Sequence, residues 1–223
     1  MSIITPILNE EKLLLSQSSY YRGITQRAEL IFIDGGSLDK SAEIAGRFGQ
    51  ILHSQKGRAT QMNCGARLAQ EKLLLFLHAD TKIALKTLDS IETKVEQGSY
   101  IGGCLTQRID KDGFAYRFIE SFGNARARST KVFYGDQGIF IRKDAFWQMG
   151  GFPEAPVMED IIFSKKMRKL GKTIVLPDKI WVSPRRWEKQ GILKTVFLYS
   201  LLNILFRLKI PLNRIKKLYA ELR

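Results

Sequence analysis

Two polar residues directly after an apolar run have side chains that suit a divalent metal. His78 and Asp80 lie two residues apart, so both can point to the same side of an extended chain. Carboxylate oxygen suits Mg²⁺ or Mn²⁺ held jointly with substrate phosphates, and imidazole is tolerated better by Mn²⁺. Asp80 and His78 are therefore the candidate metal ligands, although a structural hydrogen bond explains His78 equally well.

A basic turn and an acidic pair suit two further roles. The turn Lys56-Gly57-Arg58 precedes a helical pattern, so backbone N–H groups and the Arg58 guanidinium could meet a phosphate. Glu159 and Asp160 stand at an expected helix start, where acids also interact favourably with the helix dipole. A carboxylate there could instead deprotonate an incoming hydroxyl, which makes Asp160 and Glu159 the candidate catalytic residues.

The elements that position these residues alternate along the first half of the chain. Apolar runs over Ser2–Leu8, Glu29–Asp34 and Leu73–Leu77 predict strands buried on both faces. Helical patterns between them predict βαβ units and a mostly parallel sheet, in which ligands bind beyond the carboxyl ends of the strands. Asp34 alone is better explained as a helix N-cap, but three polar strand ends together favour a ligand site. The expected helices are 10–20, 38–49 and 58–70, with a short strand at 51–54.

The second half is more mixed. The pattern predicts strands at 102–109, 138–142 and 172–176, and helices at 114–130, from 144 onward and at 158–170. We therefore expect an α/β fold with one domain over residues 1–190. Basic amphipathic helices over 191–223 follow it.

The net charge of +14 favours polyanionic partners. No zinc spacing or basic–aromatic RNA-binding pattern accompanies the charge, so nucleic acid is not expected as the partner. Cys64 and Cys104 lack the spacing of a disulfide scaffold, and the first residues lack a secretory signal pattern. These features predict a cytoplasmic protein.

Taken in order, the segments resemble the family 2 glycosyltransferases with the GT-A fold. The resemblance covers roughly residues 1–187 and looks closest to a small bacterial branch associated with arsenosugar biosynthesis, which carries F-L-H-A-D, G-D-Q and M-E-D. The matching segments are Ile3–Glu10, Ile33–Ser37, Lys56–Arg58 with Asn63, Phe76–Asp80, Met158–Asp160 and Arg185–Trp187.

The resemblance implies a role for each matching residue. Asp160 would be the catalytic base with Glu159 beside it, and Asp80 would match the final acid of the D-x-D metal motif. His78 replaces the first acid of that motif, which puts the coordination and the preferred metal in question. The implied donor-binding residues are Pro6, Asn9, Glu10, Asp34, Gly35, Arg58, Asp80, Gly135, Asp136, Gln137, Arg185, Arg186 and Trp187.

The implied activity is a metal-dependent, inverting transfer of a sugar from a nucleotide-sugar to an acceptor hydroxyl. Mn²⁺ or Mg²⁺ is the implied cofactor, and a UDP-sugar is the favoured donor. A nucleotidyltransferase is an alternative, but the first loop, Pro6–Glu10, lacks the glycine- and basic-rich pattern of that class. A catalytically degenerate protein that binds a nucleotide-sugar or a polyanion is a second alternative, because His78 departs from the metal motif.

The C-terminal segment has two explanations. Gly191–Leu208 is strongly apolar, yet only Thr195–Phe206 is free of charge, and a membrane-spanning helix needs about 20 apolar residues. The helices could pack on the catalytic domain or on a second subunit of a homodimer. They could instead make a peripheral contact with the anionic inner face of the membrane, which would place the site beside a lipid-linked acceptor.

Overall fold

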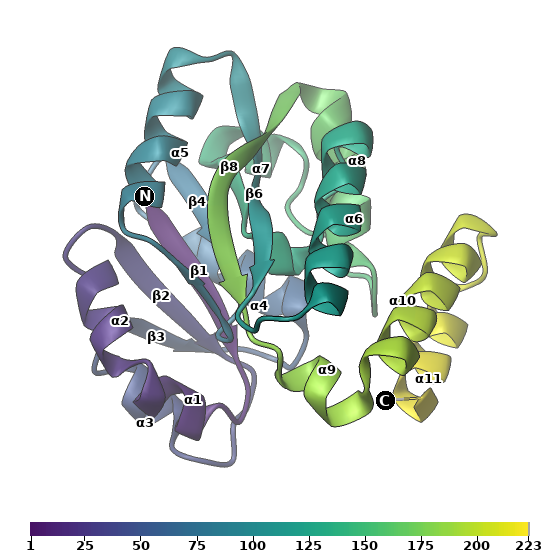
Figure 1. Ribbon diagram of the computed structural model, residues 1–223. Coiled ribbons are helices and arrows are strands. Elements are labelled where there is room, and N and C mark those ends of the chain that lie inside the picture. Colours follow the sequence, from purple (N-terminus) through teal and green to yellow (C-terminus); the bar gives the residue numbers. More distant parts are fainter. Residues whose placement is uncertain (223) are drawn as a thin grey trace.

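The structure is a computed structural model that describes residues 1–222, and a mixed eight-stranded sheet forms its centre (Figure 1). The strand order is β3-β2-β1-β4-β7-β6-β8-β5. The strands are β1 (Ser2–Ile7), β2 (Glu29–Asp34), β3 (Gln50–His53), β4 (Leu73–Phe76), β5 (Thr81–Ile83), β6 (Tyr100–Ile109), β7 (Ile139–Arg142) and β8 (Lys172–Val182).

Helices cover both faces of the sheet, and the last two project from its side (Figure 1). The helices are α1 (Glu11–Ser16), α2 (Ser18–Ile24), α3 (Ser41–Ala45), α4 (Arg58–Leu68), α5 (Lys86–Gln97), α6 (Phe114–Thr130), α7 (Lys143–Gln148), α8 (Glu159–Leu170), α9 (Arg185–Gln190), α10 (Ile192–Arg207) and α11 (Leu212–Leu222). A short 3-10 turn, Gly135–Gln137, precedes β7.

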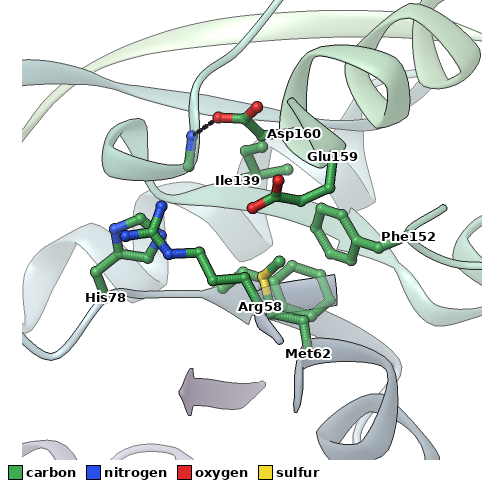
Figure 2. Close-up of a pocket in the computed structure, with 9 residues that line it drawn as sticks. Arg58, Met62, His78, Ile139, Phe152, Glu159 and Asp160 are labelled. Atoms are coloured by element: carbon green, nitrogen blue, oxygen red, sulfur yellow. Dashed lines mark hydrogen bonds between the residues drawn. The ribbon is translucent and has the colours of Figure 1, made fainter. Parts of the chain in front are cut away.

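The N-terminal half confirms the predicted parallel arrangement. Strand β1 pairs in parallel with both β2 and β4, and β2 pairs in parallel with β3. The carboxyl ends of these strands therefore meet at one edge of the sheet, where His78 follows β4 and lines a pocket (Figure 2).

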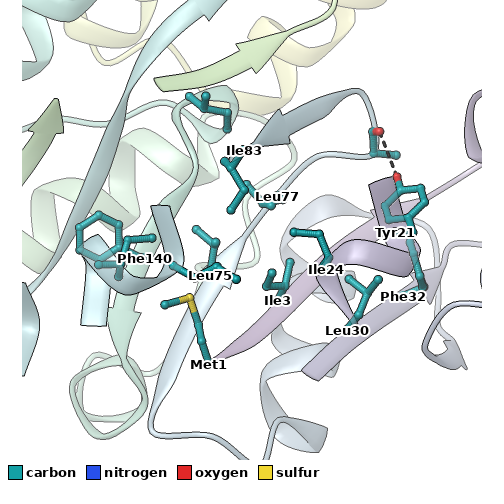
Figure 3. Close-up of a cluster of buried hydrophobic side chains, with 14 of the residues drawn as sticks. Met1, Ile3, Tyr21, Ile24, Leu30, Phe32, Leu75, Leu77, Ile83 and Phe140 are labelled. Atoms are coloured by element: carbon teal, nitrogen blue, oxygen red, sulfur yellow. Dashed lines mark hydrogen bonds between the residues drawn. The ribbon is translucent and has the colours of Figure 1, made fainter. Parts of the chain in front are cut away.

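Successive residues of a strand point to opposite faces, and both faces are covered. Ile3 belongs to one buried cluster with Phe32 and Leu75 (Figure 3), whereas Ile4 belongs to a second cluster with Phe76. Burial on both sides explains why these strands are continuous apolar runs rather than alternating ones.

The C-terminal half adds antiparallel strand pairs, which make the sheet mixed. Strand β7 is antiparallel to β4 and to β6, and β5 is antiparallel to β8. The predicted strand at 172–176 continues to Val182, because a register shift in the pairing of β6 with β8 accommodates Pro177. A proline lacks a backbone N–H and is tolerated in a sheet at such an irregularity.

Two expected helices differ from the structure. The pattern over 10–20 becomes two short helices, α1 and α2, and the pattern over 38–49 is helical only from Ser41 to Ala45. The residues just before α3 stay in a loop because side chains hold their backbone: Asn9 Oδ1 accepts the N–H of Leu38 at 2.8 Å, and Glu11 accepts that of Lys40 at 3.1 Å. Such side-chain bonds compete with the helical ladder.

The C-terminal helices pack on each other and touch the main domain. Leu198 and Leu202 of α10 form a small core with Ile215 of α11. Asn203 of α10 accepts a hydrogen bond from the hydroxyl of Tyr134 at 3.0 Å. Within residues 1–222, no helix has both the length and the apolar character that crossing a bilayer requires. Arg223, which the sequence places in the last helix, lies outside the described residues.

Candidate functional site

The candidate site lies where the carboxyl ends of β1, β2 and β4 face the start of α8. Side chains from α4, β4 and α8 and from the loop before β7 meet there around one pocket (Figure 2). The pocket is lined by Arg58, Met62, Phe76, His78, Gly135, Ile139, Phe152, Glu159 and Asp160.

The imidazole of His78 is neutral in this pocket. Desolvation, followed by the positive charge of Arg58, lowers the pKa of His78 to about 3, and Arg186 and Arg185 act in the same direction. Asp80 opposes them but does not outweigh them. A neutral ring keeps a nitrogen lone pair at physiological pH, so His78 can ligate a metal or accept a hydrogen bond.

Asp160 lies in the first turn of α8, with its carboxylate turned toward the loop before β7. Its Oδ2 accepts the backbone N–H of Gly135 at 2.8 Å, the bond drawn in Figure 2. Burial raises the pKa of Asp160, and the hydrogen bonds from Gly135 and Ile161 only partly offset it. A raised pKa makes the carboxylate a stronger base, which suits general-base catalysis.

Glu159 lies beside Asp160 and is 9% exposed. Burial raises the pKa of Glu159, the charge of Asp160 raises it further, and Arg58 opposes both. Met158, just before the pair, has a φ of 62°, which a non-glycine residue rarely adopts. This turn directs both acids into the pocket, and such local strain is often found at functional sites.

Arg58 is the first residue of α4, after Gly57 at a φ of 155°. Its guanidinium lies beside His78, and its side chain passes below Glu159 (Figure 2). The charge of Arg58 acts on the pKa values of His78, Glu159 and Asp160, so it is the common cation of the pocket. A phosphate here would meet the N-terminus of a helix and a guanidinium together.

Arg185 connects two predicted donor-binding residues. Its guanidinium donates to both oxygens of Glu10, at 2.7 and 2.6 Å, and to Asp80 at 3.3 Å. The pair with Glu10 is bidentate, and hydrogen bonding to Glu10 raises the pKa of Arg185. The end of β1, the end of β4 and the start of α9 therefore meet at one ion-pair cluster.

Arg186 points in another direction, toward the C-terminal helices. It donates a hydrogen bond to the hydroxyl of Tyr199 on α10 and lies over that ring at 5.8 Å. Its charge also acts on His78 and Asp136, so Arg186 connects the pocket with α10.

Asp34 and Asn9 shape the loop after β2. The Asp34 carboxylate accepts the N–H groups of Gly36 and Ser37, both at 3.1 Å, and His53 Nδ1 lies 3.2 Å from it. Burial would raise the pKa of Asp34, but the hydrogen bonds of Ser37, His53 and Gly36 outweigh it and lower that pKa. Asp34 is therefore ionised and holds the turn.

Pro6 and Gly35 lie near the same strand ends. Pro6 pairs with Ile33 near the end of β1, and the N–H of Gly35 donates to the carbonyl of Ile7 at 3.0 Å. A Cβ on Gly35 would lie 3.0 Å from the side-chain amide of Gln61, so the position favours glycine.

The loop Gly135-Asp136-Gln137 contacts the pocket closely. A Cβ on Gly135 would lie only 2.9 Å from His78 Nε2. Asp136 accepts a hydrogen bond from Gln107 at 2.7 Å, while its second oxygen is buried with no partner among the described residues. Burial, then the charge of Asp160, raises the pKa of Asp136. Gln137 is buried and holds the loop through the N–H of Tyr134 at 3.0 Å.

Trp187 and Asn63 lie away from the polar side chains of the pocket. Trp187 is 9% exposed and packs edge-on against Tyr116 of α6. Asn63 exchanges two hydrogen bonds with the backbone of Phe152 and so holds a loop against α4. The role of Trp187 in binding the nucleotide-sugar stays a prediction. In this structure its side chain packs α9 against α6.

Sequence reasoning missed the polar side chains that support the site. Gln61 lies on α4 and is 4% exposed. Its side-chain amide donates to the carbonyl of Ile7 at 3.0 Å and to that of Ile33 at 2.8 Å, near the ends of β1 and β2. Gln107 donates a hydrogen bond to Asp136, and the hydroxyl of Tyr199 accepts one from Arg186. In the sequence, only Gln61 could have been identified as such a support, because it is a polar residue on an otherwise apolar face of a predicted helix.

The described residues hold no cluster of three or more His, Cys, Asp or Glu that could bind a metal by themselves. The protein offers two donors after β4, the neutral ring of His78 and the carboxylate of Asp80. Mg²⁺ and Mn²⁺ sites often use one or two protein ligands and take the others from substrate phosphates and water, so the donor set fits a cation shared with a diphosphate.

Comparison with known proteins gives related sequences. Residues 2–150 match the model of the family described as Glycosyl transferase family 2. The undecaprenyl-phosphate 4-deoxy-4-formamido-L-arabinose transferase of Photorhabdus laumondii is 29% identical over 157 residues, which cover 64% of this chain and 48% of that protein. The transferase of the same name from Pseudomonas savastanoi is 26% identical over 157 residues, 46% of its length. The chain thus spans about half the length of the curated relatives it matches.

Solved structures share the fold at low identity. S. aureus TarS 1–349 in complex with UDP-GlcNAc is 19% identical with a TM-score of 0.64, covering 82% of this chain and 58% of that one. The mannosyltransferase PcManGT from Pyrobaculum calidifontis, in complex with GDP-Man and Mn²⁺, is 18% identical with a TM-score of 0.65, covering 81% and 55%. The family match spans more than half of the chain, and the fold agrees with it. The chain therefore belongs to glycosyl transferase family 2 and has the GT-A fold.

Proposed function

We propose that this protein transfers a sugar from a nucleotide-sugar to an acceptor hydroxyl with inversion at the anomeric carbon. The observation that carries the proposal is the pairing of a base and a cation in one pocket. Asp160 has a raised pKa and faces Arg58 beside a neutral His78. A proton acceptor beside a phosphate-binding cation is what glycosyl transfer requires.

The proposed reaction needs a base for the acceptor hydroxyl and positive charge for the leaving diphosphate. The Asp160 carboxylate takes the proton of the acceptor hydroxyl while that oxygen forms a bond to the anomeric carbon. The bond from that carbon to the nucleotide diphosphate breaks on the opposite face, which inverts the configuration. Arg58, with Arg185 and Arg186, neutralises the charge that grows on the departing diphosphate. General-base assistance of this kind is worth roughly 10²–10⁴-fold in rate.

Asp80 and His78 are the proposed ligands of a divalent cation shared with the donor diphosphate. Mn²⁺ or Mg²⁺ bound there would supply Lewis-acid stabilisation of the leaving group. Arg185 contacts Oδ2 of Asp80 at 3.3 Å, so a cation bound to Asp80 would either share this carboxylate with Arg185 or displace it. Arg185 is also held by its bidentate pair with Glu10, which keeps a positive charge at this end of the site.

The acceptor is proposed to be lipid-linked, with a peripheral membrane contact through α10 and α11. Relatives named as undecaprenyl-phosphate sugar transferases support the acceptor class. Side chains that α10 leaves in solvent support the contact: Leu193 is 86% exposed and Phe197 is 68% exposed. Arg214, Lys216 and Lys217 of α11 add exposed positive charge.

A second candidate is transfer to a lipid phosphate rather than to a hydroxyl, which the name of those relatives favours. A phosphate oxygen is already ionised and needs no general base, so Asp160 would not serve as one. The association with arsenosugar biosynthesis, the UDP preference, the cytoplasmic location and the homodimer stay predictions.

A thermal-shift screen tests the proposal. UDP-, GDP- and dTDP-sugars are added with and without Mn²⁺, because a ligand that binds only the folded state raises its stability by RT ln(1 + [L]/Kd). We expect one donor to raise the Tm, with a larger rise when Mn²⁺ is present, and the same donor to be hydrolysed slowly. If no nucleotide-sugar stabilises or reacts, the proposed function is wrong.

A further inference from the structure

Helix α6 leaves a face of three phenylalanines in solvent. Phe114, Phe118 and Phe122 are 86%, 65% and 70% exposed. They follow one another at four-residue intervals, so they lie on one side of the helix. We name these three side chains the phenylalanine face.

No charged side chain interrupts this face among the exposed positions of 114–125, where the other members are Ala115, Ser121 and Ala125. The charged residues of this stretch turn inward. Glu120 is 6% exposed and bonds to the N–H of Ile109, and Arg117 pairs with Glu120 at 3.1 Å. Single exposed apolar residues are ordinary, whereas a contiguous set indicates an interaction surface.

Helix α6, which carries the phenylalanine face, and helix α10 meet at one small core. Ile119 of α6 and Ile192 of α10 pack against the same small core, which contains Tyr116 and Trp187. From this junction α10 continues with its own apolar side chains in solvent, and Figure 1 shows α6, α9 and α10 on the same side of the sheet. The exposed members on α10 are Leu193 (86%), Phe197 (68%), Ile204 (53%) and Leu208 (67%).

The charges around these two apolar sides indicate what covers them. Lys194, Arg207 and Lys209 are exposed along α10 and its end, and Arg128 is exposed near the end of α6. Glu188, before the start of α10, is paired with Lys111. Asp110 and Asp112 are exposed just before α6, and these four basic residues outnumber them. A second copy would bring the same +14 charge to the interface and would be repelled. An anionic lipid surface meets both the apolar and the basic requirement.

We propose that the phenylalanine face inserts into the interface of an anionic bilayer, together with the exposed side of α10. The inference deepens the proposed function, on which it rests for the presence of a lipid-linked acceptor. Two contacts on different helices fix the orientation of the domain, which one helix alone cannot do. Tyr134 and Arg186 connect α10 directly to the pocket, so the bound orientation would hold the active site at the lipid surface.

A site-specific label tests the insertion. The full chain carries Phe118→Cys in a Cys64→Ser background, labelled with the environment-sensitive fluorophore NBD; Cys104 is buried and does not compete. Leu15→Cys on α1, where Leu15 is 49% exposed, is the matched control. With phosphatidylcholine vesicles that contain phosphatidylglycerol, the label at 118 should brighten severalfold and shift to the blue. The label at 15 should not change, and neither should the label at 118 with pure phosphatidylcholine.

A double variant, Phe118→Ser with Phe122→Ser, tests the contribution to binding. Its affinity for the anionic vesicles should fall about tenfold or more in sedimentation. Donor-induced stabilisation should be unchanged, because these residues do not line the pocket. An unchanged vesicle affinity, or a silent label at 118, overturns the inference. So does a dimer in analytical ultracentrifugation that the double variant dissociates. If instead no nucleotide-sugar raises the Tm of the unsubstituted protein, the result counts against the proposed function and leaves the membrane insertion untouched.

Discussion

At the scale of single residues, the pocket concentrates groups whose charge states are far from their usual ones. His78 is held neutral by desolvation and by the arginines, while burial raises the pKa values of Asp160, Glu159 and Asp136. Groups with perturbed pKa values that lie together in a pocket make it a candidate functional site.

Asp160→Asn tests the proposed base. Transfer to a hydroxyl should fall by roughly 10²–10⁴-fold, with donor affinity retained because the substitution is nearly isosteric. In the unsubstituted protein the transfer rate should fall at low pH as Asp160 takes up a proton. Because the pKa of Asp160 is raised, this fall should begin at a higher pH than for an ordinary carboxyl group, and it should be absent in the variant. Transfer kept within a few-fold would favour the lipid-phosphate acceptor, or Glu159 as the base.

The same variant makes a prediction about stability. The pKa of Asp160 is higher in the folded state than in the unfolded chain, so the folded state favours the protonated carboxyl. This preference adds to the free energy of unfolding in full only below the unfolded-state pKa. That contribution is lost as the pH rises through the folded pKa. At neutral pH, Asp160→Asn should therefore have a Tm equal to or above that of the unsubstituted protein, and a clearly lower Tm would contradict this view.

Asp80→Ala and His78→Ala test the metal ligands. Asp80→Ala should remove the Mn²⁺-dependent part of donor binding, and His78→Ala should reduce it less, because a carboxylate carries the charge that the cation needs. Calorimetric titration of the donor with and without Mn²⁺ measures both effects. If Mn²⁺ still strengthens donor binding to Asp80→Ala as in the unsubstituted protein, Asp80 is not a ligand.

Gly135→Ala tests the contact between the loop and His78. The new Cβ would lie 2.9 Å from Nε2, so the ring or the loop must move, and donor binding or turnover should fall at least several-fold. Gly123→Ala on α6 is the matched control, since its Cβ meets only Gln107 Oε1 at 3.5 Å. The control should keep activity and gain ~0.5–1 kcal/mol of stability from the better helix former.

At the scale of elements, helix α4 holds the ends of two strands through one side chain. Gln61 donates to the carbonyls of Ile7 and Ile33, at the carboxyl ends of β1 and β2. Gln61→Met keeps the volume but leaves both carbonyls without this donor, which should cost ~1–3 kcal/mol in chemical denaturation. Thr60→Ala, one residue earlier on the same helix, is the control and should cost clearly less. Equal stability of Gln61→Met and the unsubstituted protein would show that water replaces the amide.

At the scale of the whole molecule, the positive charge is a structural liability as well as a means of binding. Like charges repel within the folded chain, and salt screens that repulsion over about 10 Å at 0.1 M. The Tm should therefore rise when NaCl is added to a low-salt buffer. Lys216→Glu with Lys217→Glu on α11 lowers the net charge and should have a smaller salt dependence. The same salt dependence in both proteins would assign the effect to something other than the net charge.

The sequence alone determined the parallel N-terminal half and the placement of its polar strand ends. Short continuous apolar runs such as Leu73–Phe76, bounded by polar residues, favour strands covered on both faces, and parallel strands bring their carboxyl ends to one edge. The order of motifs also identified the family, and the family model matches residues 2–150.

Only the tertiary structure decided which distant side chains meet and which apolar side chains stay in solvent. Arg185 reaches Asp80 across 105 residues and Glu10 across 175, contacts that follow from the closing of the sheet and from no local pattern. Helix α6 is apolar on two sides, at Tyr116 and at Phe118, and periodicity cannot say which side meets the sheet. The side of α6 that carries Tyr116 packs on Trp187. The phenylalanine face stays exposed because no described element covers the opposite side of this surface helix.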